Sequence, residues 1–82
     1  MHTYRVIVGG VGKTCITLRD GNGHFHLARF LNEPPTEGLV LGGGRPHLGF
    51  GMLICLDSKQ MFRVIFERIN STKAAEFASF AS

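Results

Sequence analysis

Glycine recurs at short intervals along this chain and divides it into short segments. Eleven of the 82 residues are glycine, which is nearly twice the usual share in soluble proteins. The segments between the glycines are rich in β-branched and aromatic residues, a pattern typical of short strands joined by tight turns. The sequence therefore predicts a fold built mainly from antiparallel strands. A chain of this length has room for one core, so we expect a single domain over residues 1–82.

Strand-like segments and turn signals alternate along most of the chain. We expect strands at residues 4–8, 13–19, 24–31, 52–56 and 61–69, with residues 39–41 as a further short candidate. Residues 32–38 are expected to form a loop because they contain two prolines, which a central strand excludes. Residues 42–51 are half glycine and are expected to lack regular structure.

The end of the chain favours a helix. Asn70 or Ser71 can cap a helix from about residue 72 to 81, which is rich in alanine and carries an apolar stripe. The predicted fold class is therefore α+β: a small antiparallel sheet of four to five strands, arranged as two hairpins, with one C-terminal α-helix packed on one face. A curled sheet, the glycine-rich segment or a second subunit must cover the other face, so a homodimer is an open expectation.

The first hairpin turns at Asp20-Gly21-Asn22-Gly23, where Asp-Gly and Asn-Gly both favour a two-residue turn. With either choice, the residues on the expected core face are Ile16, Leu18, Phe25 and Leu27. The other face, which we expect to be polar and solvated, carries Cys15, Thr17, Arg19, His24, His26 and Ala28. Only a three-residue loop would change these faces, and the sequence favours it less.

Charge and cysteine content narrow the class of protein. The net charge is +3, and the nine basic residues are spread along the chain, whereas nucleic-acid binders usually concentrate them. Cys15 and Cys55 lie in apolar runs without metal-ligand spacing and are expected to be reduced thiols. We expect no cofactor. No apolar run is long enough to span a membrane and no secretion signal is evident, so the expectation is a cytoplasmic protein without membrane association.

Residues 6–14, VIVGGVGKT, approach the pattern of a phosphate-binding loop. The motif requires its first glycine at the position held by Ile7. The residues after Thr14 alternate as a strand does, whereas a phosphate-binding loop opens a helix. We therefore expect a glycine turn between two strands, and no nucleotide hydrolysis.

His24 and His26 lie two residues apart on one expected strand, close enough to share a metal ion. A metal site needs a third or fourth ligand. Cys15 and His47 are the candidates, and neither is held near the pair by spacing alone. The same residues lack the orienting carboxylate that a cysteine nucleophile and its histidine base would need. We therefore expect solvated histidines, with no metal site and no catalytic residues.

The glycine-rich residues 42–51 display Arg45, His47 and Phe50. Arginine and aromatic side chains suit a protein-binding hot spot or stacking on a single-stranded base. We favour protein contact, because nucleic-acid affinity depends on many phosphate contacts and the surrounding charge is sparse. The predicted partner-binding residues are Arg45, His47, Phe50, Arg19, His24 and His26.

The function expected from these observations is a non-enzymatic protein-interaction module that binds a larger complex. Small chains of mixed charge are often inhibitors that occlude such a complex, as phage and mobile-element anti-defence proteins of the anti-CRISPR kind do. The alternative is a small nucleic-acid-binding or regulatory module that uses the glycine-rich segment and the basic hairpin face. A metal-dependent or enzymatic role and a structural subunit are further alternatives.

Overall fold

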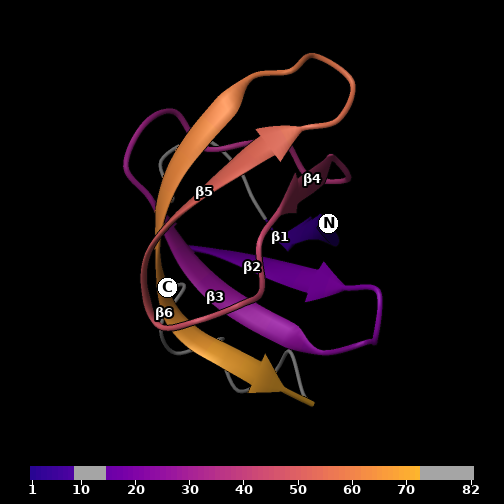
Figure 1. The fold of residues 1–82 in the computed structure, drawn as a ribbon, viewed down its shortest axis with the longest axis vertical. Coiled ribbons are helices and arrows are strands. Elements are labelled where there is room, and N and C mark those ends of the chain that lie inside the picture. The colour runs from indigo at the N-terminus through magenta and orange to yellow at the C-terminus, as the bar shows by residue number, and fades with distance from the viewer. Residues whose placement is uncertain (9–14, 73–82) are drawn as a thin grey trace.

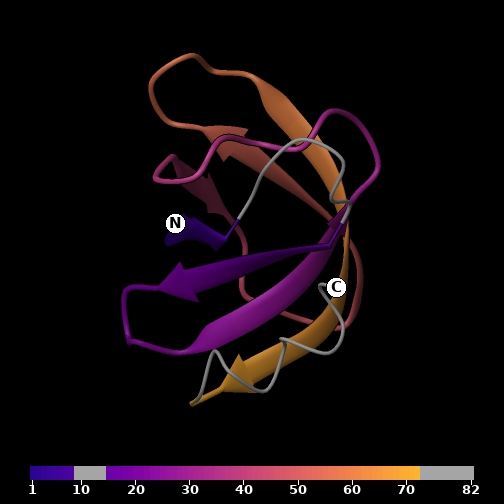
Figure 2. The same cartoon turned by 180° about the vertical axis from the view of Figure 1, so that it is seen from behind.

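The structure, a computed structural model, describes residues 1–8 and 15–72. These residues form six strands: β1 (His2–Val8), β2 (Cys15–Asp20), β3 (Phe25–Phe30), β4 (Val40–Gly43), β5 (Gly49–Cys55) and β6 (Met61–Ser71). All neighbouring strands are antiparallel and follow the order β1-β2-β3-β6-β5-β4, with β4 pairing back to β1. The sheet is thus a closed barrel, seen from two opposite sides in Figures 1 and 2.

The α+β prediction, a small open sheet covered by a helix, is wrong. The described residues are all-β and contain no helix, hence none long and apolar enough to cross a membrane. The helix expected from about residue 72 to 81 falls on residues 73–82, outside the described part of the chain. Asn70 and Ser71, expected to cap that helix, instead lie in β6. Because the sheet closes on itself, its inward face is covered without a helix.

The barrel interior is filled by apolar side chains from all six strands. Alternate residues of each strand point inward, as the strand period of two requires. Phe62, Val64 and Phe66 of β6 are buried, as the alternation in that segment predicts. The buried core consists of Tyr4, Val6, Ile16, Leu18, Ala28, Phe30, Leu41, Leu53, Cys55, Phe62, Val64 and Phe66.

The loop between β2 and β3 has three residues, Gly21, Asn22 and Gly23. The Asp20 N–H donates to the His24 carbonyl at 2.9 Å, and the Gly23 N–H donates to the Asp20 carbonyl at 3.1 Å. Gly23 has a φ of 83°, a left-handed conformation that glycine adopts without a steric penalty. Three-residue hairpin loops commonly place glycine at this position. The predicted two-residue turn is therefore wrong by one residue.

The extra loop residue exchanges the two faces of β3 relative to β2. Leu18 lies opposite His26, and Arg19 lies opposite Phe25. His26 therefore points into the barrel and is fully buried, although a solvated face was expected for it. A shift of one residue has this effect because successive side chains of a strand point to opposite faces.

The glycine-rich residues 42–51 are more regular than expected. Gly42 and Gly43 belong to β4, and the strand β5 begins at Gly49, which leaves only residues 44–48 as a loop. At Gly43 a Cβ atom would lie 2.7 Å from Leu53 Cδ2 and 3.0 Å from the Met52 carbonyl oxygen. A larger residue here would therefore require the Leu53 side chain and the β5 backbone to shift.

Candidate functional site

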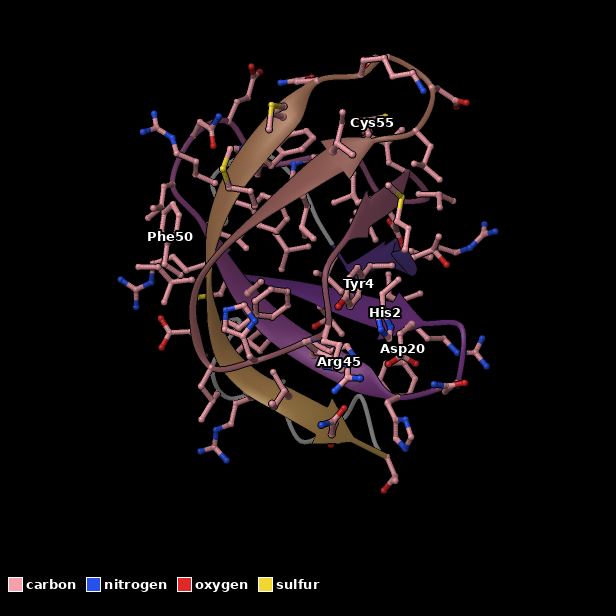
Figure 3. All side chains as sticks on the ribbon, viewed as in Figure 1. His2, Tyr4, Asp20, Arg45, Phe50 and Cys55 are labelled. Atoms are coloured by element: carbon pink, nitrogen blue, oxygen red, sulfur yellow. The ribbon has the colours of Figure 1, made fainter. Side chains whose placement is uncertain are left out.

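The loop ends of the strands define two ends of the barrel. One end, called here the arginine end, holds the start of β1, the β2–β3 loop, residues 44–48 and the end of β6. Figure 3 shows His2, Tyr4, Asp20 and Arg45 gathered on this side of the molecule, with Phe50 on the outside of the barrel and Cys55 toward the other end.

The predicted partner-binding residues are divided between the surface and the interior. Arg19, Arg45, His47 and Phe50 are exposed, and His24 is half-buried. His26 is not a surface residue, because the three-residue loop turns it inward. No group of three or more His, Cys, Asp or Glu side chains in the described residues could hold a metal ion.

His26 connects three strands inside the arginine end. Its Nε2 lies 2.8 Å from Asp20 Oδ2, and its Nδ1 accepts a hydrogen bond of 3.1 Å from the Asn70 N–H. An Nδ1 that accepts cannot carry a proton, so Nε2 bears the hydrogen and donates it to Asp20. Asn70 has a φ of 57° and lies where the pairing of β3 with β6 shifts register. His26 thus supplies an acceptor for an N–H in an irregular part of the ladder.

Asp20 has a pKa below its usual value of 3.8. Burial by itself raises this pKa, since its side chain is only 6% exposed. The hydrogen bond from His26 and those from the N–H groups of His24 and Asn22, at 3.0 and 2.9 Å, outweigh burial. The carboxylate therefore stays charged, with its acceptor sites directed at the hairpin loop and at His26.

Tyr4 completes this buried polar group. Its hydroxyl donates to the Gly44 carbonyl at 2.8 Å, and its ring meets the His26 ring edge-on at a centroid distance of 5.5 Å. Burial, together with the negative charge of Asp20, raises the pKa of Tyr4 to about 12. Both ring nitrogens of His26 are occupied and its ring is buried, so the group Tyr4, Asp20 and His26 links three strands and residue 44 at the arginine end.

His47 holds the loop of residues 44–48 in a compact turn. Its Nδ1 lies 3.1 Å from the Arg45 carbonyl oxygen, and its Nε2 lies 2.9 Å from the Phe50 carbonyl oxygen. Both bonds form together only when both nitrogens carry hydrogen, so these two acceptors raise the pKa of His47. Protonation of His47 therefore stabilises the observed conformation of the loop.

An apolar face lies on the outside of β5 and β6. Phe50, Met52 and Met61 are 56%, 46% and 51% exposed, and Ile54 and Ile65 are half-buried. The cross-strand pairs are Phe50 with Ile65, Met52 with Arg63 and Ile54 with Met61. We call these six residues the β5–β6 face.

Sequence reasoning named Phe50 as a partner-binding residue but did not name the other five residues of this face. The continuous apolar run at residues 52–56 favours a strand buried on both sides, whereas in the barrel only one side of β5 is buried. Arg5 was also missed as a site residue, because its neighbour Arg19 becomes adjacent only through the pairing of β1 with β2.

Comparison of the chain with protein-family models, with curated proteins and with solved structures finds no match in any of the three. The expectation of a phage inhibitor thus has no support and is withdrawn.

Proposed function

We propose that this chain is a non-catalytic protein-binding module that docks through the β5–β6 face. The observation that carries the proposal is the register of β5 against β6, which places three exposed large apolar side chains and one arginine on a single continuous surface. Isolated exposed apolar residues are normal, but contiguous ones mark an interaction surface.

The composition of the β5–β6 face matches the centre of a protein interface. Aromatic residues, methionine and arginine are enriched at such centres, while lysine and acidic residues are depleted. Phe50 is the best anchor because a phenyl ring buries a large area and orders few torsions. Met52 and Met61 can adapt their shape to a partner around this anchor.

Arg63 defines the chemistry of the partner. It lies opposite Met52 within the face, and among the described residues no acidic side chain forms an ion pair with it. Glu67, further along β6, already pairs with Arg29 at 3.0 Å. A partner that covers Arg63 must supply a carboxylate, since a buried unpaired charge is costly.

A second copy of this chain meets that requirement poorly. In a two-fold dimer, residues near the centre of the interface face their own copies, so two Arg63 side chains would be brought together. We therefore infer a different protein, with an apolar pocket for Phe50 and an acidic group for Arg63.

Affinity capture from a lysate of the native host, followed by calorimetry with the purified partner, tests this proposal. We expect Phe50→Ser and Arg63→Glu each to weaken binding about 10-fold or more. Leu31→Ser is the matched control, because Leu31 is 50% exposed but lies outside the face, and it should leave affinity unchanged.

Two results would count against the proposal. One is a partner whose affinity is the same for the wild type and both face variants. The other is a homodimer, seen by sedimentation equilibrium, that Phe50→Ser dissociates, since this would assign the face to self-association.

A further inference from the structure

Two arginines lie directly opposite each other on the outside of β1 and β2. Arg5 pairs in register with Arg19, and both side chains are exposed. Side chains directly opposite on antiparallel strands are about 5 Å apart at Cβ, and like charges placed there repel. Among the described residues, no acidic side chain forms an ion pair with either arginine. The register of β1 and β2 thus places two arginines opposite each other, and neither forms an ion pair with an acidic side chain of the described residues.

The two arginines line a hollow of about 320 Å³. The other residues that line it are Thr3, Tyr4, Asp20, Gly21 and Val40. This volume is at the lower end of the range of small-molecule sites. We propose that the hollow binds a phosphate group of a small phosphorylated molecule.

Asp20 lines the hollow but does not neutralise it. Its carboxylate accepts hydrogen bonds from His26, from the His24 N–H and from the Asn22 N–H. These contacts turn its acceptor sites toward the hairpin loop and the barrel interior. Asp20 therefore fixes the loop that carries Gly21 while the charges of Arg5 and Arg19 remain available to a ligand.

A second hollow, of about 370 Å³, shares Asp20 with the first. His2, His24 and Arg45 line it together with Asn70. The basic side chains therefore continue around the arginine end beyond the first hollow. A ligand with a second anionic group, such as a diphosphate, could extend from Arg5 and Arg19 toward Arg45.

The geometry of the pair favours phosphate over a single carboxylate. Each guanidinium presents a planar fork of donors that fits two oxygens of a phosphate. A phosphate near neutral pH carries up to two negative charges, enough to balance both arginines, whereas a carboxylate balances one. A nucleic-acid strand is disfavoured because it needs a track of many cations, and the two hollows together are lined by three arginines.

Calorimetric titration with inorganic phosphate and with pyrophosphate, at low salt, tests the site. We expect both probes to bind, pyrophosphate more tightly. Arg5→Ala and Arg19→Ala should each weaken binding about 10-fold or more, which is the loss expected for one charge-assisted fork. Arg63→Ala removes the same charge from the β5–β6 face and should leave phosphate affinity within about 2-fold.

The melting temperature of each variant shows whether a loss of binding comes from loss of the site or from unfolding of the protein. Removing one of two repelling charges should leave the melting temperature equal or higher in the absence of ligand. Gly21→Asp gives a second probe, since a Cβ at this position meets no atom within 4 Å. The new carboxylate should pair with the arginines and abolish phosphate binding while the fold is retained.

Three outcomes would overturn the inference: no binding of either phosphate probe, binding that survives Arg5→Ala and Arg19→Ala, or loss of binding with Arg63→Ala. Tighter binding of a single-stranded oligonucleotide than of pyrophosphate, with a steep salt dependence, would replace the small-molecule site by a nucleic-acid surface. None of these results affects the proposal for the β5–β6 face, which uses different residues.

Discussion

The two ends of the barrel interior are filled in different ways. At the end of the barrel opposite the arginine end, Phe30 and Phe62 pack edge-to-face at a centroid distance of 5.6 Å. At the arginine end, Tyr4, Asp20 and His26 form a hydrogen-bonded group in the same barrel. The apolar end is stabilised by the burial of apolar surface, which depends little on small shifts of individual side chains. The polar end requires each donor to meet its acceptor, because an unpaired buried group is costly.

This difference suggests that the two ends contribute differently to stability and to the shape of the surface. Apolar packing stabilises the barrel without preference for direction, whereas the hydrogen bonds of Asp20 fix the hairpin loop that borders the proposed phosphate site. Removal of contacts at the apolar end should therefore lower stability alone. Removal of contacts at the polar end should lower stability less and also change the shape of the arginine end.

The largest effect is expected from Phe62→Ala at the apolar end. Phe62 is 2% exposed and packs against Phe30, so its truncation leaves a cavity and should cost about 3–5 kcal/mol of unfolding free energy. Urea denaturation followed by circular dichroism measures this. Met61→Ala, at an exposed neighbouring position, should cost less than about 0.5 kcal/mol. Similar costs for the two variants would contradict the assignment of Phe62 to the core.

A smaller but substantial loss is expected from His26→Leu at the polar end. The substitution removes the donor to Asp20 and the acceptor for the Asn70 N–H, and we expect a cost of about 2–3 kcal/mol. His24→Leu is the control, since its ring forms no hydrogen bond with the residues that the structure describes, and it should change stability little. Amide chemical shifts of residues 20–24 should move in His26→Leu. An unchanged loop would contradict the positioning role of this histidine.

The polar end should also make stability depend on acid pH. The pKa of Asp20 is lower in the folded chain than its usual 3.8, so its contribution is complete above that value and is lost as pH falls through the lower, folded pKa. Denaturation midpoints of the wild type should therefore fall from about pH 5 to pH 3. Asp20→Asn should be less stable at neutral pH and show a shallower fall. Parallel pH curves would exclude Asp20 as a source of the effect.

The smallest predicted effect is spectroscopic. Tyr4 is the sole tyrosine of a chain without tryptophan, so absorbance at about 295 nm reports its ionisation alone. In the folded protein the midpoint should lie near the pKa of about 12 and not at 10.0. The raised pKa means that stability is lost as pH rises from the lower value to the higher. Asp20→Asn should lower the midpoint, because the negative charge near Tyr4 is removed. A midpoint of 10.0 in the wild type would contradict the burial of the Tyr4 hydroxyl.

Much of the strand content could be predicted from the sequence. The strands expected at residues 4–8, 24–31 and 61–69, and the loop at residues 32–38, are confirmed with shifts at their ends. These features depend on local alternation and on proline, which act within a few residues. Closure of the barrel was not predicted, because it depends on β1 pairing with β4 and β3 with β6, contacts that no local pattern encodes.

The candidate site residues were also predicted only in part. The exposure of Arg45 and Phe50 was predicted from an irregular glycine-rich segment at residues 42–51; both side chains are exposed, but Phe50 lies in β5. The face of His26 did not follow, because one extra loop residue reversed it. By itself the sequence determined a β-rich chain with strands and turns near their observed positions. The tertiary structure decided which side chains are inside and that Arg5 meets Arg19, because strand faces alternate with a period of two and register is set across the sheet.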